Sequence, residues 1–435
     1  MNVSRSETRQ HEKRKRKRKI RRLMIINVTL LTIIVAVIAV WLIGLNPNKA
    51  ADSPNSGNDS GQNQPNEPNE PDDTNGDSPP NDVGLGKDED ESNMDPVTDN
   101  DPPPADDGDG NSGTADEGNE EGEKISLSFV GDVLLAPYVE DVMKKNGFDF
   151  PYRESLLYLS EPDLTAANFE YAVTLRDAPA ENKQYVYKGP PDPLPAFRDA
   201  GFDVVSLANN HTMDHGAEGL LDTMDYLDKA GISHMGAGKN DTEAFAPSIH
   251  EVRGVKVAYV GLSRVVPEVS WKADKNTPGV AETYDTTRAV EAIAKANDMA
   301  DLVVVMVHWG TERTTVLEDY QKQFARQYID AGADLVIGSH PHVLQGFEMY
   351  NGKWIAYSLG NFIFGLNPKG EEKDTGVLDA VCSKSGECDM TFHPMVSVNS
   401  QPIPLEGDEA TTLLDRLTSI SFGVALREDG RLEAQ

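Results

Sequence analysis

From about residue 125 onward, the hydrophobic residues of this chain fall into short continuous runs that alternate with longer amphipathic stretches. Short apolar runs are typical of buried strands, and stretches with apolar residues three or four positions apart are typical of helices. Their alternation predicts an α/β fold. We expect strands at residues 125–130, 204–207, 255–262, 302–307, 335–337 and 354–358, and helices at residues 139–146, 152–159, 194–200, 219–230, 286–299 and 320–331.

The pattern changes after Gly365, where short alternating runs separated by turns replace the alternation of strands and helices. We expect strands at residues 377–381, 390–398 and 420–426 in this part of the chain. Their spacing predicts a second, more antiparallel sheet. Two sheets packed face to face, with helices on the outside, would form a four-layer α/β/β/α sandwich.

A different hydrophobic pattern marks the N-terminal part. Residues 23–45 carry no charged side chain, and residues 1–22 carry eleven Lys and Arg against two Glu. A helix of 23 residues is about 35 Å long, enough to cross a hydrocarbon core of about 30 Å. A cleaved signal peptide has a shorter apolar core, and here Asn48 and Lys49 precede the nearest small residues. We therefore expect one uncleaved transmembrane anchor, with the basic tail in the cytoplasm and the remaining chain outside the membrane.

Residues 46–123 form a third compositional region, with 23 acidic residues, only Lys49 and Lys87 as basic residues, and almost no large apolar side chain. Such a composition predicts a disordered, extended stalk. The expected extracytoplasmic domain, residues 124–435, has 27 basic and 47 acidic residues, which argues against a nucleic-acid partner. The basic tail could bind nucleic acid, but its position beside the apolar span favours contact with anionic lipid.

Polar segments rich in metal-ligand residue types directly follow five of the apolar runs. Because ligands of α/β sheets collect outside the carboxyl ends of the strands, we expect these segments to converge at one edge. Imidazoles combined with carboxylates suit Mn, Zn or Fe, whereas an all-oxygen site would suit Mg or Ca. The sequence therefore predicts a metal centre. The segments are Gly131-Asp132, Asn168-Phe169-Glu170, Asn209-Asn210-His211, His308 and Ser339-His340-Pro341-His342.

The order and spacing of six motifs resemble the CapA-type capsule-synthesis family, which is implicated in poly-γ-glutamate production. The resemblance covers residues 124–364 well and the remainder loosely. It implies a fold similar to that of the calcineurin-like metallophosphoesterases, and a partnership with the membrane components of a poly-γ-glutamate synthase. The motifs are Gly-Asp after the first strand, Asn-Phe-Glu, Leu-Ala-Asn-Asn-His, His-Trp-Gly-x-Glu, Gly-Ser-His-Pro-His and Ser-Leu-Gly-Asn-Phe.

Carried over segment by segment, the phosphoesterase pattern implies a role for each candidate residue. His211 would act as the general acid for a leaving oxygen in a two-metal hydrolysis, with metal-activated water as the nucleophile. The substrate would be a phosphorylated compound or the anionic polymer. The implied ligands are Asn210, His308 and His340 for one metal, Glu170 as a bridging carboxylate, and Asp132 and His342 for the second metal.

Two departures from the phosphoesterase pattern affect the second metal. The usual Asp-x-His opening is replaced by Asp132-Val133-Leu134, and the usual Gly-Asp-x-x-Asp is replaced by Asn168-Phe169-Glu170. We therefore expect one well-built metal site and one that is weak, exchangeable or empty. Two functions stay open: a metal-dependent hydrolase acting on phosphoester or γ-glutamyl bonds, and a non-catalytic subunit that binds metal or polymer and supports a membrane polymer synthase.

Four further polar residues are candidates for contacting substrate or supporting the ligands: Asn168, Asp214, Glu312 and Asn361. Three of them have an alternative role that needs no ligand. Asp214 could cap the helix that follows it, Glu312 could be solvated, and Asn361 could bond locally in a turn.

The two cysteines, Cys382 and Cys388, flank a turn-like segment between two alternating runs. Outside the membrane a disulfide between them would persist, because that compartment is oxidising. A hairpin could bring the two residues close enough to pair. The alternative is a pair of free thiols.

Overall fold

The computed structural model describes residues 124–181, 183–365 and 367–435. The basic tail, transmembrane anchor and acidic stalk expected at residues 1–22, 23–45 and 46–123 lie outside these residues, so those expectations stay predictions. In the part of the chain that the structure describes, no helix is both long and apolar enough to cross a bilayer.

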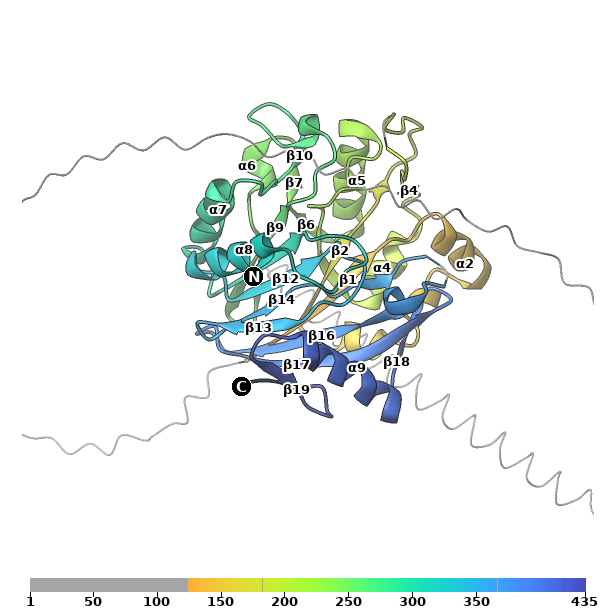
Figure 1. The fold of residues 1–435 in the computed structure, drawn as a ribbon. Coiled ribbons are helices and arrows are strands. Elements are labelled where there is room, and N and C mark those ends of the chain that lie inside the picture. The colour runs from red at the N-terminus through yellow and green to blue at the C-terminus, as the bar shows by residue number, and fades with distance from the viewer. Residues whose placement is uncertain (1–123, 182, 366) are drawn as a thin grey trace, which may run out of the picture. The chain divides into compact units, whose positions relative to one another are not determined.

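The larger of two main sheets has eight strands (Figure 1). The strands of this sheet within residues 125–235 run parallel to one another, whereas the three C-terminal strands run antiparallel to their neighbours. The order across the sheet is β18 (Gln401–Pro404), β17 (Cys388–Val398), β16 (Asp374–Cys382), β1 (Ile125–Val133), β2 (Leu164–Phe169), β5 (Phe202–Ser206) and β6 (Ser233–Met235), and β15 (Asn361–Ile363) also pairs with β1.

The second sheet has six strands and draws on the middle of the chain. Its four inner strands are parallel, and each edge strand is antiparallel to its neighbour. The order is β13 (Phe347–Tyr350), β14 (Lys353–Ala356), β12 (Leu335–Ser339), β11 (Leu302–His308), β9 (Val255–Ser263) and β8 (Ser248–Val252).

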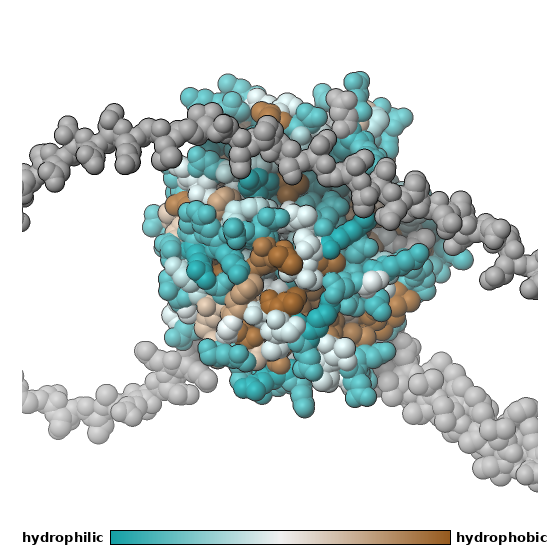
Figure 2. All heavy atoms as spheres, in the orientation of Figure 1, coloured by the Kyte–Doolittle hydropathy of each residue, from teal (hydrophilic) through white to brown (hydrophobic). Residues whose placement is uncertain are grey.

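Three hydrophobic cores hold four layers together. A central core lies between the two sheets and contains alternate residues of the facing strands, such as Leu127 of β1 and Val304 of β11. The opposite face of each sheet packs against helices in a core of its own. Hydrophilic residues predominate on the face drawn in Figure 2, where hydrophobic residues form small separate areas. The helices are α2 (Tyr138–Asn146), α4 (Leu194–Ala200) and α5 (Gly216–Ala230) on the first sheet, and α7 (Thr287–Asn297) and α8 (Asp319–Asp330) on the second.

The predicted α/β fold is confirmed, but the C-terminal strands do not form a sheet of their own. β16 pairs antiparallel with β1 along five residues, so β16, β17 and β18 extend the first sheet. This pairing places apolar residues of β16, such as Leu378 and Ala380, in the central core with those of β1. The second sheet is built instead from residues 248–356.

Two predicted elements were also wrong in part. The expected helix at residues 152–159 is divided into a 3-10 turn, Phe150–Tyr152, and the short helix α3, Leu156–Ser160. The expected strand at residues 420–426 is reduced to β19, Val424–Leu426, because the preceding residues form helix α9, Gly407–Ile420. Leu413, Leu414 and Leu417 of this helix pack into the central core, which explains why the segment folds as a helix.

Cys382 at the end of β16 and Cys388 at the start of β17 are cross-strand neighbours, and they are joined by a disulfide. Cys382 is fully buried in the central core. Of the two states that the sequence left open, the structure therefore has the bonded one.

Two glycines allow backbone segments to approach closely next to candidate ligands. A Cβ on Gly131 would lie 1.9 Å from the carbonyl oxygen of Gly360, and a Cβ on Gly338 would lie 1.9 Å from that of Tyr357. Both contacts are with backbone, which cannot move aside as a flexible side chain could. Glycine at these positions therefore lets the residues that follow, Asp132 among them, take their places at the edge of the sheets.

Candidate metal centre

Polar residues that follow the strands of both sheets meet at one edge of the structure. Asp132 lies near the end of β1, where it is paired in register with Asn168 of β2 and Asn361 of β15. His308 ends β11 of the other sheet. Side chains from the two sheets touch here, because Asn168 Nδ2 lies 3.3 Å from His308 Nδ1. The structure thus brings together segments that are far apart in the sequence.

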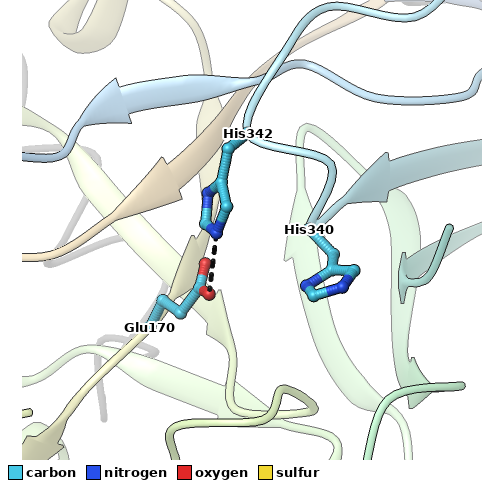
Figure 3. A group of neighbouring side chains, drawn as sticks. All are labelled: Glu170, His340 and His342. Atoms are coloured by element: carbon cyan, nitrogen blue, oxygen red, sulfur yellow. Dashed lines mark ion pairs between the residues drawn. The ribbon is translucent and has the colours of Figure 1, made fainter. Parts of the chain in front are cut away.

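Glu170 lies at the centre of this cluster. Its Oε1 atom is 3.8 Å from His308 Nε2 and 3.9 Å from His342 Nε2. The cluster contains two sets of three residues whose ligand atoms all lie within 4.8 Å of one another: Glu170, His340 and His342 (Figure 3), and Asp132, Glu170 and His308. Glu170 belongs to both sets, as a bridging carboxylate would.

Two buried ligand atoms of the cluster have no hydrogen-bond partner in the described part of the chain: Glu170 Oε1 and His340 Nδ1. A buried polar atom without a partner is costly, and a bound cation would satisfy both atoms at once. The Asn210 side-chain oxygen lies 2.9 Å from His308 Nε2 and adds an amide oxygen to the donors. The mixture of imidazole, carboxylate and amide groups fits a divalent transition metal such as Mn, Zn or Fe.

Asn168 orients the two carboxylates. Its Nδ2 atom donates hydrogen bonds to Asp132 Oδ1 at 2.8 Å and to Glu170 Oε2 at 3.0 Å. Its own side-chain oxygen accepts a hydrogen bond from Asn209 Nδ2 at 3.1 Å. Of the two roles open to Asn168, these contacts favour supporting the ligands over contacting substrate.

His342 and Asp132 are bound to each other. His342 Nδ1 lies 3.2 Å from Asp132 Oδ2 and 2.8 Å from Asn361 Oδ1. Asn361 therefore contacts a candidate ligand and does not simply bond within a turn. The resemblance implies that His308 and His340 share one metal, and that Asp132 and His342 share the other. In the structure, His342 instead lies in the same set of three as His340, and Asp132 lies in the same set as His308.

His211 is held by Asp214, whose Oδ2 atom lies 2.7 Å from His211 Nδ1. The same oxygen accepts a hydrogen bond from the backbone N–H of Tyr187 at 2.6 Å. The side chain of Asp214 makes no cap for α5: the N-cap position of this helix is His215, and the Asp214 oxygens bond to Lys183, Tyr187 and His211 instead. The capping alternative for Asp214 is therefore wrong. Glu312 is exposed and has no hydrogen bond in residues 124–435 as far as these are described, which agrees with its solvated alternative.

Three residues around the cluster were missed by the sequence analysis: Lys183, Tyr187 and Phe364. Lys183 Nζ donates to the carbonyl oxygen of Asn210 at 2.6 Å. The Tyr187 ring lies 4.5 Å from the His211 ring, and the Phe364 ring lies 4.7 Å from the His342 ring, measured between centroids. No strand or helix pattern surrounds Lys183 and Tyr187 in the sequence, so only the folded chain shows where they lie.

The backbone at two candidate ligands has positive φ angles, 97° at His340 and 58° at His342. Non-glycine residues adopt such angles at a cost of about 1–3 kcal/mol, and these residues tend to lie at functional sites. The turn between the two is held by Arg313, whose backbone N–H donates to the Pro341 carbonyl oxygen at 2.8 Å. The strained turn directs both imidazoles toward the cluster (Figure 3).

At His342 the effect of burial on the pKa is outweighed by the hydrogen bond and ion pair with Asp132, which raise that pKa. At the other two ligand imidazoles burial controls the charge. It lowers the pKa of His340 to about 3 and lowers the pKa of His308 well below its ordinary value, with neighbouring histidines adding to both shifts. Both rings are therefore neutral near pH 7, which is the form that binds metal. Burial also lowers the pKa of His211, although Asp214 opposes this shift.

The pKa values of the two carboxylates, Glu170 and Asp132, are shifted in opposite directions. Burial raises the pKa of Glu170 well above its ordinary value, and the charge of Asp132 raises it further. Burial alone would raise the pKa of Asp132 as well, but its hydrogen bond and ion pair with His342 hold that pKa below its usual range. A cation beside Glu170 would stabilise the charged carboxylate.

Comparison with known proteins identifies the family of this chain. Residues 126–366, more than half of the sequence, match the family described as "Bacterial capsule synthesis protein PGA_cap". The chain therefore belongs to this family of bacterial capsule synthesis proteins, and the CapA-type resemblance seen in the motifs is confirmed.

Three relatives illustrate the similarity. The PGA biosynthesis protein CapA of Bacillus subtilis (strain 168) is 35% identical over 314 residues, which are 71% of this chain and 81% of that protein. The capsule biosynthesis protein CapA of Bacillus anthracis is 36% identical, with 56% of this chain and 61% of that protein covered. A probable polyglutamine synthesis accessory protein of Mycobacterium tuberculosis is 32% identical, with 49% and 59% covered.

Solved structures show a more distant similarity. The NAD nucleotidase of Haemophilus influenzae gives a TM-score of 0.41 at 15% identity, with 69% of this chain and 64% of that chain covered. A hypothetical protein from Thermus thermophilus gives a TM-score of 0.40 at 17% identity, with 62% and 99% covered. These values are too low to support any inference about the chemistry of this chain.

The low pKa of His340 predicts how stability depends on pH. The unfolded chain binds a proton at this histidine below about pH 6.5, whereas the folded chain resists it down to about pH 3. Lowering the pH through this window therefore favours unfolding, by about 1.4 kcal/mol per pH unit for one such group. We expect the free energy of unfolding of the metal-free protein to fall more steeply with decreasing pH than that of His340→Gln.

Urea titrations of the two proteins, run after chelator treatment at about pH 5 and about pH 7.5, measure this difference. His250→Gln is a suitable control, because that histidine is also buried but lies outside the cluster. Parallel pH dependences for the native chain and His340→Gln would contradict the assignment of a buried neutral imidazole.

Proposed function

We propose that this protein is a membrane-anchored, extracytoplasmic component of poly-γ-glutamate capsule biosynthesis, and that residues 124–435 form a metal-dependent hydrolase of the metallophosphoesterase type. Membership of the capsule synthesis family supports the biological process. The observation that carries the chemistry is a pair of buried ligand atoms, Glu170 Oε1 and His340 Nδ1, that have no hydrogen-bond partner among the described residues. Their cluster also contains four other potential ligands.

A divalent transition metal (Mn, Zn or Fe) is the proposed cofactor. When bound, it would supply the Lewis acidity that activates water and stabilises negative charge on phosphoryl oxygens. Asp132 and His342 satisfy each other by hydrogen bonding, which agrees with one strong site and a weaker second one. The residues that would hold metal are Asp132, Glu170, Asn210, His308, His340 and His342.

His211 is the proposed general acid. The completely buried Asp214 and Lys183 both contact ring atom Nδ1, so the other ring nitrogen is the one that can serve a leaving oxygen. Burial of His211 beside the ligand cluster limits competing water. A positioned acid of this kind contributes about 10²–10⁴-fold to the rate of a proton-transfer step.

The proposed substrate is a phosphorylated compound or the anionic polymer itself. The excess of 20 negative charges on residues 124–435, from 47 acidic and 27 basic residues, would repel a polyanion unless cations lay between them. The sequence contains no Gly-x-x-x-x-Gly-Lys-Ser/Thr phosphate loop, so polymer elongation would require a separate ATP-using partner. Membrane components of a poly-γ-glutamate synthase are the proposed partners.

A second candidate function is a non-catalytic subunit that binds metal or polymer and supports the synthase. The observation that favours it is the mutual hydrogen bonding of Asp132 and His342, because a two-metal hydrolase would need both side chains as ligands. In this case the metal would have a structural or polymer-binding role, and His211 would not affect any reaction.

Hydrolysis of an alkyl phosphodiester such as glycerophosphocholine, whose alkoxide leaving group needs a proton, by the purified full chain loaded with Mn or Zn tests the proposed enzyme. We expect His211→Ala to lower kcat by about 10²–10⁴-fold while metal content is unchanged. His393→Ala is the matched control, because His393 is bonded to Asp379 outside the cluster. Metal binding without any hydrolysis would support the non-catalytic function, and hydrolysis unchanged in His211→Ala would eliminate the proposed acid.

The membrane anchor has its own test. The full chain should sediment with membranes and resist carbonate extraction, and removal of residues 1–45 should abolish both properties, because residues 23–45 are the uncharged apolar span. Protease added to intact cells should digest the domain formed by residues 124–435 if it lies outside. A full chain that stays in the supernatant would overturn the anchored arrangement.

A further inference from the structure

Lys183 is a buried cation that joins the metal cluster to the proposed acid. It belongs to the segment that connects the short strands β3 (Ala172–Val173) and β4 (Lys188–Gly189) in the sequence, and its side chain is only 13% exposed. Its Nζ atom lies 2.6 Å from the Asn210 carbonyl oxygen, 2.5 Å from Asp214 Oδ1 and 2.9 Å from His211 Nδ1. These three groups match the three protons of an ammonium group.

His211 Nδ1 has two competing partners. It lies 2.9 Å from Lys183 Nζ and 2.7 Å from Asp214 Oδ2. A neutral imidazole nitrogen either carries a proton and donates, or carries a lone pair and accepts. Nδ1 therefore either donates to Asp214 or accepts from Lys183, and this choice decides which nitrogen of the ring holds the proton.

The surrounding contacts favour Lys183 as the partner. Asp214 does not need the His211 proton, because its Oδ1 accepts from Lys183 and its Oδ2 accepts from the Tyr187 backbone N–H. The third proton of Lys183 has His211 Nδ1 as its acceptor, and a proton on Nδ1 would instead face the ammonium group. The ammonium contacts both Asp214 and Nδ1, so it also offsets the repulsion between the carboxylate and the nitrogen lone pair.

We propose that Lys183 is a positioning residue that donates to His211 Nδ1 and thereby keeps the ring proton on Nε2. Nε2 makes no hydrogen bond to any residue that the structure describes, so its proton is available to a ligand. The Nε2 proton is then the one that a leaving oxygen would take. The catalytic meaning of this inference rests on the proposed function, but the position of the proton does not.

Nitrogen NMR of the full chain tests the position of the proton directly, because protonated and unprotonated imidazole nitrogens resonate in separate ranges. The protein is labelled with 15N in its histidine rings and freed of metal by chelation, and the His211 signals are identified by their loss in His211→Gln. We expect Nε2 in the protonated range and Nδ1 in the unprotonated range.

Lys183→Met removes the donor and should move the proton to Nδ1, where Asp214 is then the remaining partner. The two His211 signals should exchange ranges. Lys183→Arg retains a cationic donor and should restore the native pattern at least in part. Lys188→Met is the matched control from the same segment, since Lys188 bonds to Asp177 and to the Arg176 carbonyl oxygen, and it should leave the His211 signals unchanged.

A proton on Nδ1 of the native chain, or a His211 spectrum that does not respond to Lys183→Met while the other histidine signals stay in place, would overturn the inference. If Lys183→Met disturbs all histidine signals, the inference is tested by the position of the proton in the native spectrum and in the spectrum of Lys183→Arg. The two proposals fail separately: a native chain with the proton on Nε2 but no hydrolytic activity contradicts only the enzyme, and an active chain with the proton on Nδ1 contradicts only the role of Lys183.

Discussion

The folded structure has to hold two carboxylates, Asp132 and Glu170, beside each other in a buried site. Like charges at short distance repel, and burial increases the cost of each charge. Asn168 donates to both side chains, and His342 pairs with Asp132. Glu170 Oε1 remains without a partner among the residues described. The site is thus built with an excess of electron-pair donors, which a cation would balance.

The rest of the fold serves to bring these donors together. Two sheets packed face to face place the carboxyl ends of β1, β2 and β5 against those of β11 and β12. Gly131 and Gly338 permit the close backbone contacts just before the ligand segments. The positive φ angles of His340 and His342 show that local backbone preference is overridden at this turn. Strain of this kind persists only where the surrounding contacts define the position of the chain.

Much of the site could be predicted from the sequence because the hydrophobic runs are buried strands. A potential ligand directly after such a run therefore lies at the end of a strand. His308, which follows residues 302–307, is the plainest example. Lys183 has no comparable signal, since it lies in an irregular polar stretch and reaches His211 only in the folded chain. In the fold, the alternation of strands and helices was sufficient for the α/β class. The place of β16 was not predictable, because its alternating pattern is compatible with either sheet and only its pairing with β1 decides.

Metal content is the most direct test of the central claim. The full chain would be stripped with chelator, reloaded with an equimolar mixture of Mn, Zn and Fe, freed of unbound ions by gel filtration and measured by elemental analysis. We expect one tightly held transition metal per chain, lost when Glu170→Gln removes the shared carboxylate charge. A folded native chain that retains no metal, or one that retains it unchanged in Glu170→Gln, would contradict the claim that these buried donors are gathered around a cation.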